Sequence, residues 1–445
     1  MSFSHELPHS CQGFARLAPA LNRRSAARFV LLLVGAILAR GRRTVTTWIR
    51  AVGLSDQFRS CYIAVAAAGK KAQTIASLLI ITAIRPALGR VERLTVSLDD
   101  TPTRRYGPWV EGAGIHHNPT PGPAGSTHVY GHVFVVLAIL AIHPAWGVIA
   151  LPLMSSMYIR RKDLPSLDPR HRPEFQTKLE MAVELLRWAK PRLESLAESI
   201  WLVTDGAYAS TEVLATARSL GMTVVSRLRR DAALHALPPQ VPTGRRRRGR
   251  PRIYGAERIS LSKRAGQRRG WTTETITLYG QPAVKRYKTF LATWRPAGGV
   301  IRVVLVDEPT GWRAYFCTDP TASVSDILTT VANRFALEIA FRDVKEEVGA
   351  GKQQVRHLWA SIGAFHICLW TFTLTELWAW NRPASELVDR SASPWDNASR
   401  RPSHADKRRA WRREILGEEI RGVLVPGVTE QEIRATAERL LRLAA

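Results

Sequence analysis

Two apolar strands of this sequence run directly into acidic side chains. The alternating apolar stretch "LTVSL" precedes Asp99 and Asp100, and the apolar run "SIWLVT" ends at Asp205. Ligand-binding and catalytic groups gather at strand ends in sheets that are flanked by helices. One Asp after a strand is usually a turn or helix-capping residue. Two such strands, if they are neighbours in one sheet, place their acids side by side and favour a site.

The predicted elements around these acids follow the order of an α/β fold. After a strand over 94–100, the patterns predict a hairpin over 131–155, a helix from Glu174, a strand ending at Asp205, a helix over 210–220 and a strand over 222–228. Three strands, a helix, a strand, a helix and a strand predict a mixed sheet flanked by helices. The uncharged run 130–159 also resembles a membrane span, but "AIHPAWG" divides it into two strand-length halves.

The rest of the chain differs in pattern from this α/β core. We divide the sequence into a helical N-terminal DNA-binding region (1–93), a first core segment (94–228), a β-rich basic insertion or satellite domain (229–318), a second core segment (319–385) and a C-terminal helical region (386–445). In the first region, the apolar run 29–39 is predicted to be a core helix rather than part of a leader peptide. A Thr-capped helix that ends near Gly53, followed by a second helical stretch, leaves two interpretations open, a helix-turn-helix and an ordinary basic helical hairpin.

The charge balance points to a polyanionic partner. With 64 Lys and Arg against 37 Asp and Glu, the formal charge is +27, which favours nucleic acid first and an anionic membrane second. The segment "GRRRRGRPR" adds six candidate phosphate contacts, Arg245, Arg246, Arg247, Arg248, Arg250 and Arg252. Four widely spaced cysteines suggest neither a zinc site nor a disulfide framework, which is typical of a reducing cytosol.

A late helical segment, 323–351, supplies a third acid. At 100° per residue, Arg334, Glu338 and Lys345 fall within about 40° of one another. The apolar stripe beside them consists of Leu337, Phe341, Val344 and Val348. A charged row is often only a solvated face. Here the charged row follows a sheet with two strand-end acids, so a functional site competes with the solvated face as an interpretation. If Glu338 is not the third acid, Glu346 and Glu347 are the next candidates.

Three carboxylates are hard oxygen ligands that suit Mg²⁺ or Mn²⁺ rather than zinc. Two such ions about 3.5–4 Å apart activate an attacking oxygen and stabilise the leaving oxygen of a phosphodiester. The acids and the positive charge together predict a metal-dependent nuclease or phosphoryl-transferase that acts on nucleic acid. His116 and His117 in "GIHHNP" are alternative metal ligands, although the Pro and Gly residues around them favour a structured loop.

Several motifs resemble those of bacterial insertion-sequence DDE transposases. These are "LDDTP", "VTDGAYA" and the spacing of Arg334, Glu338 and Lys345, which is similar to the branch with a Tyr-xx-Arg-xxx-Glu-xxxxxx-Lys motif. The loop "RYGPWVEGAGIHHNPTPGPAG" and the basic "RGRPRIYG" are also similar to stretches of such transposases. The resemblance covers roughly residues 40–380. One departure is Val331, which stands at the position of the motif's Tyr.

The resemblance implies a ribonuclease H-like core, and we expect it to hold two Mg²⁺ or Mn²⁺ ions. Its acids match Asp100, the one followed by Thr, then Asp205 and Glu338. Arg334 and Lys345 match the family's phosphate-contacting bases, and Arg342 on the same helix is a further DNA-binding candidate. From the residues alone, the choice between Asp99 and Asp100 stays open, because strand alternation shows only that Asp100 shares a face with Val96 and Leu98.

We therefore expect a DNA transposase that cleaves transposon ends and transfers the strands into target DNA, with hairpin ends as one route. The expected partners are double-stranded terminal inverted repeats and target DNA, bound by a homodimer that assembles on DNA, and no membrane. The expected location is the bacterial cytoplasm, at the nucleoid. The alternatives are a nuclease or resolvase on the same core and a transposase-derived DNA-binding regulator without catalysis.

Overall fold

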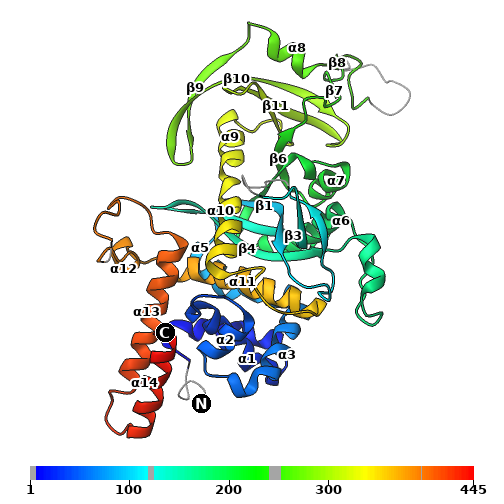
Figure 1. The fold of residues 1–445 in the computed structure, drawn as a ribbon. Coiled ribbons are helices and arrows are strands. Elements are labelled where there is room, and N and C mark those ends of the chain that lie inside the picture. The colour runs from blue at the N-terminus through cyan, green and yellow to red at the C-terminus, as the bar shows by residue number, and fades with distance from the viewer. Residues whose placement is uncertain (1–6, 119–124, 240–251, 392, 445) are drawn as a thin grey trace.

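The computed structural model describes residues 7–118, 125–239, 252–391 and 393–444. Figure 1 shows an α/β core with a curved group of strands at one end and the N-terminal helices at the other. The strands are β1 (Val91–Arg104), β2 (Gly114–His117), β3 (His128–His143), β4 (Gly147–Tyr158), β5 (Ala197–Thr204), β6 (Thr223–Leu228), β7 (Leu234–His235), β8 (Arg258–Ile259), β9 (Thr272–Leu278), β10 (Gln281–Trp294), β11 (Gly299–Asp307) and β12 (Arg313–Cys317).

The helices alternate with these strands in the core and dominate both ends of the chain. They are α1 (Arg23–Leu38), α2 (Val45–Ala51), α3 (Phe58–Lys70), α4 (Ala72–Leu79), α5 (Arg85–Leu88), α6 (Lys178–Leu193), α7 (Thr211–Ser219), α8 (Leu261–Gly266), α9 (Val324–Asn333), α10 (Phe335–Asp343), α11 (Leu358–Ala379), α12 (Ala384–Leu387), α13 (His404–Gly422) and α14 (Glu430–Ala444).

The core sheet has the strand order β4–β3–β1–β5–β6. β3 is antiparallel to both β1 and β4, whereas β5 is parallel to β1 and β6 is parallel to β5. Three antiparallel strands followed by two parallel ones form the ribonuclease H-like arrangement, so the predicted fold class is confirmed. β3 and the second half of β5 are almost continuously apolar and buried, as expected where both faces of a sheet are covered.

The strands of the predicted β-rich insertion continue this sheet. Beyond β6 the order is β12, β11, β10, β7 and β8, so the described strands of the core and of the insertion belong to one sheet. β12 lies antiparallel to β6 and pairs with its outer edge. The core therefore has no open edge at β6, and its hydrogen bonds are completed by the last strand of the predicted insertion.

The uncharged run that resembled a membrane span is a hairpin, as predicted. β3 and β4 pair from Val133–Tyr158 to His143–Gly147, with an irregularity between Leu137 and Ala138. Among the described helices, α11 is the one that is long and apolar enough by itself to cross a membrane, and 89% of its most apolar window is buried inside the protein. That burial is typical of the central helix of a folded domain.

The N-terminal helices are joined to the core by the C-terminal region. The predicted core helix over 29–39 is confirmed as the buried part of α1, whose N-terminus is capped by the Asn22 side chain. At the other end of α1, the buried Arg408 of α13 donates to the carbonyl oxygens of Ala36 and Ala39. These bonds satisfy carbonyl groups that have no partner within a helix end.

Two glycines allow α3 and α11 to touch backbone to backbone. A Cβ atom on Gly363 would lie 1.9 Å from the carbonyl oxygen of Val65, and one on Gly69 would lie 2.1 Å from that of Trp359. No side chain fits at such distances. The contact holds the N-terminal helices against the central helix of the core.

Replacing Gly363 by Ala should destabilise the protein by roughly 1–3 kcal/mol, because the two helices must move apart. Urea unfolding followed by circular dichroism measures this. Gly417→Ala is the matched control, because it lies in α13 and its Cβ would meet only the mobile end of Arg421 at 3.4 Å. That change should stabilise by roughly 0.5–1 kcal/mol. Equal effects of the two changes would contradict the close contact.

Candidate active site

β1 and β5 bring Asp99 and Asp205 to the same position along the sheet. The two strands are parallel, and their last paired residues are Leu98 and Thr204. Asp99 comes next within β1, which continues to Arg104 instead of ending at Asp100 as predicted, and Asp205 directly follows the end of β5. Their proximity is also electrostatic, since the charge of Asp205 contributes to raising the pKa of Asp99. The prediction that the acids of two neighbouring strands lie together is therefore met by Asp99 and Asp205.

The third acid is linked to Asp99 through Arg334. One guanidinium nitrogen of Arg334 lies 2.8 Å from Asp99 Oδ2 and another lies 2.6 Å from Glu338 Oε1. The structure departs from the single predicted helix here, because α9 ends at Asn333 and α10 begins at Phe335. The four residues of the predicted apolar stripe are all buried, so the charged row lies at the rim as expected.

The side chain of Asp100 has other partners, although its backbone N–H donates a hydrogen bond of 2.8 Å to Asp99 Oδ1. Its Oδ2 lies 2.7 Å from Lys178 Nζ at the start of α6, and its Oδ1 accepts a hydrogen bond of 2.9 Å from the Tyr208 hydroxyl. Successive side chains of a strand point to opposite faces, which separates Asp100 from Asp99. Arg334 and Glu338 thus meet Asp99 rather than Asp100.

Lys178 and Tyr208 were not identified from the sequence. Tyr208 follows Asp205 by three residues, and its hydroxyl ties the turn after β5 to Asp100 within β1. Burial, followed by the charge of Asp100, raises the pKa of Tyr208, so its proton stays in the hydrogen bond. The "DGAY" stretch was a usable signal for this tyrosine. Nothing in the local pattern marks Lys178, whose role depends on how α6 crosses the sheet.

The surroundings of Asp99 disfavour the ionised form of its carboxyl group. Burial raises its pKa to about 6, against the opposing effect of Arg334, and the charges of Asp100 and Asp205 raise it further. Only 21% of its side chain is exposed. A buried acid beside two other acids favours any cation that can approach, and Arg334 fills that role in this structure.

The predicted basic residues divide into three groups. Lys345 donates a hydrogen bond of 2.9 Å to the Thr101 hydroxyl, one residue beyond the acids, and burial lowers its pKa. Arg342 pairs with its neighbour Asp343 and not with the acids. Arg252 is exposed. Arg245, Arg246, Arg247, Arg248 and Arg250 lie outside the described residues.

The alternative ligands lie away from this network. Arg43 lies 3.7 Å from the Glu347 carboxylate and donates to the backbone oxygen of Glu346. His116 is buried in β2 with its ring against Tyr158, and His117 faces His128 across the β2–β3 pair. Within the described ranges, no three carboxylate, imidazole or thiol groups are gathered closely enough to hold a metal ion as they stand.

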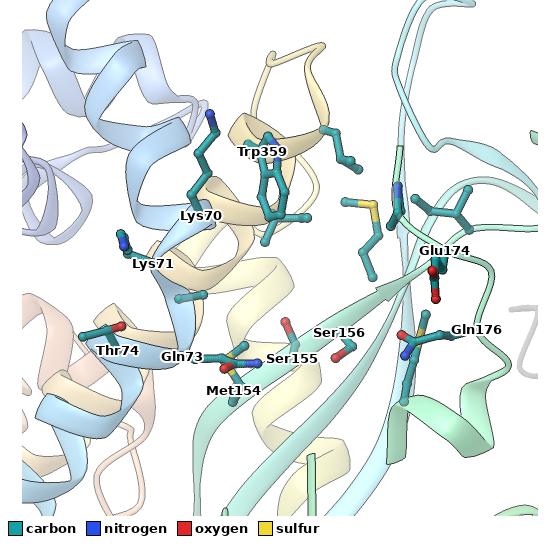
Figure 2. A pocket seen from close by; sticks show the side chains of 18 of the residues that line it. Lys70, Lys71, Gln73, Thr74, Met154, Ser155, Ser156, Glu174, Gln176 and Trp359 are labelled. Carbon is teal, nitrogen blue, oxygen red and sulfur yellow. The ribbon is translucent and has the colours of Figure 1, made fainter. Parts of the chain in front are cut away.

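A pocket of about 390 Å³ lies at the outer edge of β4, between the α3–α4 junction, the start of α11 and the segment before α6. Figure 2 shows Lys70 and Lys71 on one side of it and Glu174 and Gln176 on the other. None of the acids discussed above lines this pocket. Since β3 and β4 separate it from β1, it is not the site at which these acids act.

Comparison with known families places more than half of the chain in one family. Residues 16–296 match the DDE superfamily endonuclease family. The chain belongs to this family. The matched range includes Asp99, Asp100 and Asp205 and ends before Glu338, so the third acid rests on the geometry of α10. A comparison with curated proteins finds no match.

DDE-type endonucleases generally use divalent metal ions such as Mg²⁺. The donor set of this endonuclease fits such an ion, because the oxygens of Asp99, Asp205 and Glu338 are hard ligands. Arg334 already neutralises two of the three carboxylates, which shows where positive charge is stabilised. For the endonuclease to bind a metal ion there, Arg334 must release them.

Replacing Arg334 by Ala should therefore strengthen metal binding by the DNA-free endonuclease, although DNA engagement weakens. Removing a unit charge about 4 Å away is worth roughly 1–4 kcal/mol, so about tenfold tighter Mn²⁺ binding is expected. Electron paramagnetic resonance of free Mn²⁺ measures the affinity. Arg342→Ala is the matched control, since Arg342 pairs only with Asp343 among these groups. An Arg334→Ala protein that binds Mn²⁺ no more tightly than wild type would refute the competition.

Proposed function

We propose that this endonuclease is a DNA transposase that cleaves the ends of its own element and joins them to target DNA. One observation carries the proposal: Arg334 holds Asp99, within β1, and Glu338, and Asp205 directly follows the neighbouring strand β5. These residues come from β1, the end of β5 and α10, the three places that the resemblance to insertion-sequence transposases implies. DNA is the substrate that the family and the charge of +27 support.

We propose Asp99, Asp205 and Glu338 as the metal-holding acids. Divalent ions bound there would supply activation of the attacking oxygen and stabilisation of the leaving oxygen of a phosphodiester. Asp100 was the acid chosen from the motif, and its partners Lys178 and Tyr208 support a positioning role instead. Two ions and a homodimer assembled on DNA are part of the same proposal.

The basic residues around the acids have distinct proposed tasks. Arg334 exchanges its carboxylate partners for a phosphate of the bound strand, since guanidinium binds both groups with the same fork of donors. Lys345 contacts Thr101, which lies two residues after Asp99 in β1, so it is placed to bind the next phosphate. Arg342 and the arginines between 245 and 252 contribute affinity for DNA without sequence preference.

A nuclease or resolvase on the same core is the second candidate, because the same acids cut DNA without joining it. The experiment that separates the two uses end-labelled duplexes that carry the inverted repeats flanking the coding region, incubated with the full chain, Mg²⁺ and a target plasmid. Nicked, hairpin and joined products are then resolved on gels. Joined products support the transposase, whereas cleavage alone supports the nuclease. An Asp205→Asn protein shows whether either product comes from a contaminant.

A further inference from the structure

The loop that follows β1, residues 105–113, exposes two aromatic rings while both of its ends are anchored. The side chains of Tyr106 and Trp109 are 81% and 77% exposed, although large aromatic rings are normally buried. Directly after them, Val110 is buried. An exposed aromatic pair on an anchored loop is a feature that neither the core nor the acids explain.

Polar contacts hold both ends of this loop. At its start, the buried Arg105 guanidinium donates to the carbonyl oxygens of Gln353 and Val355. Near its end, the Glu111 carboxylate accepts a hydrogen bond of 2.7 Å from the backbone N–H of Leu358, at the N-terminus of α11. The Glu111 backbone N–H also donates to the Arg356 carbonyl oxygen at 2.9 Å. The rings are therefore presented by a fixed backbone, so little order has to be gained on binding.

The segment to which the loop is anchored displays cations. In residues 352–356, Gln353 and Val355 are buried, whereas Lys352, Gln354 and Arg356 are exposed. The anchoring bonds of Arg105 and Glu111 place this alternating row directly beside the aromatic loop. Exposed Lys and Arg next to exposed rings match the two parts of a nucleotide, its phosphate and its base.

The surface also lies in line with the acids. Lys345 contacts Thr101, and a Cβ on Gly351 would lie 3.0 Å from Thr103 Cβ, so the chain after α10 follows β1 towards the loop. From Asp99 to Arg105 is six residues of strand, or roughly 20 Å at 3.3 Å per residue. That distance is a few nucleotides of a DNA strand that passes over the acids.

We propose that Tyr106 and Trp109 bind unstacked bases of single-stranded DNA beside the cleavage site, with Lys352 and Arg356 on the adjoining phosphates. Bases within a duplex are stacked on one another, so two exposed rings can stack only on bases that have left the duplex. The exposed cations of residues 352–356 make an uncharged apolar partner, such as a lipid chain, a poorer match than DNA. The inference rests on the proposed function only in taking DNA as the partner.

The test measures binding of fluorescein-labelled oligonucleotides to the full chain without Mg²⁺, by anisotropy, for a 15-nucleotide single strand and for the matching duplex. Trp109→Ala and Tyr106→Ala should each weaken single-strand binding roughly 5- to 150-fold, the usual range for one lost stacking contact, and leave duplex binding nearly unchanged. Trp109→Phe should restore most of the affinity. Lys352→Gln should lower the single-strand salt slope by about 0.7.

Trp395→Ala is the matched control, because Trp395 is 82% exposed but lies between α12 and α13. It should change neither affinity. Equal single-strand affinity of wild type and Trp109→Ala, or equal losses for Trp109→Ala and Trp395→Ala, overturns the inference and leaves the proposed function standing. A change in oligomeric state without a change in DNA binding overturns it in favour of a protein contact. Wild type that binds neither strand form overturns both proposals.

Discussion

Replacing Glu338 by Gln should reduce DNA cleavage by roughly 10²–10³-fold, the usual cost of removing one group that stabilises charge in the transition state. Gln keeps the size and helix propensity of Glu but removes a negative oxygen ligand. DNA binding should persist or strengthen, since the change removes an acid from a basic surface. Labelled transposon-end DNA with Mg²⁺ gives the cleavage rate, and gel-shift titration gives the affinity.

The neighbouring acids provide the matched comparison for Glu338. Asp99→Asn should lose cleavage as completely as Glu338→Gln, because Asp99 shares Arg334 with Glu338. Asp100→Asn should retain more activity, since the Asp100 side chain contacts Lys178 and Tyr208 and not Arg334. Cleavage near the wild-type rate by Glu338→Gln would move the third acid elsewhere. Greater damage from Asp100→Asn than from Asp99→Asn would restore Asp100 as the first ligand.

Replacing Glu376 by Ala should destabilise the protein by about 3–5 kcal/mol, the usual cost of leaving a buried charge unpaired. Glu376 of α11 is 3% exposed, lies 2.7 Å from His404 Nδ1 and is paired with the buried Lys407 Nζ. Both partners belong to α13, so the loss loosens the C-terminal region from the core. Urea unfolding monitored by circular dichroism measures the change.

The pH dependence of this contact has a definite sign. Burial would raise the pKa of Glu376, but Lys407 and His404 outweigh it and lower the value to about 2. A lowered folded-state pKa contributes stability that is fully present above the ordinary value of 4.5 and is lost as the pH falls towards 2. Asp168→Asn is the control, because the Asp168–Arg170 pair lies on the surface, and it should leave unfolding unchanged. Equal unfolding curves for both variants would show that the buried pair contributes nothing.

Much of the fold followed from local pattern. Alternating apolar residues predicted β1, the break "AIHPAWG" in an uncharged run predicted the β3–β4 hairpin, and the helical period predicted the buried stripe that contains Leu337 and Val348. The capping residue Thr44 predicted α2, which its side chain does cap. These predictions succeed because the periods of strands and helices are set by backbone geometry within a few residues.

The course of the strands after Leu228 did not follow from pattern. The sequence indicated a β-rich insertion or satellite domain, but could not show that β12 pairs with β6 and extends the core sheet. Strand pairing joins residues that are far apart in the chain, and local periodicity carries no information about which edge a strand will choose.

The sequence by itself determined which acids are candidates for the site: Asp99 or Asp100, Asp205 and Glu338 all stood out as carboxylates after apolar strand patterns or beside a basic stripe. Only the tertiary structure decided that Asp99 is the one that meets Arg334 and Glu338. Adjacent residues of a strand point to opposite faces, so the outcome depends on which face α10 covers. That face is set by the long connection through β7–β12 and by the packing of α10 on the core. Neither can be predicted from the local sequence around the two acids.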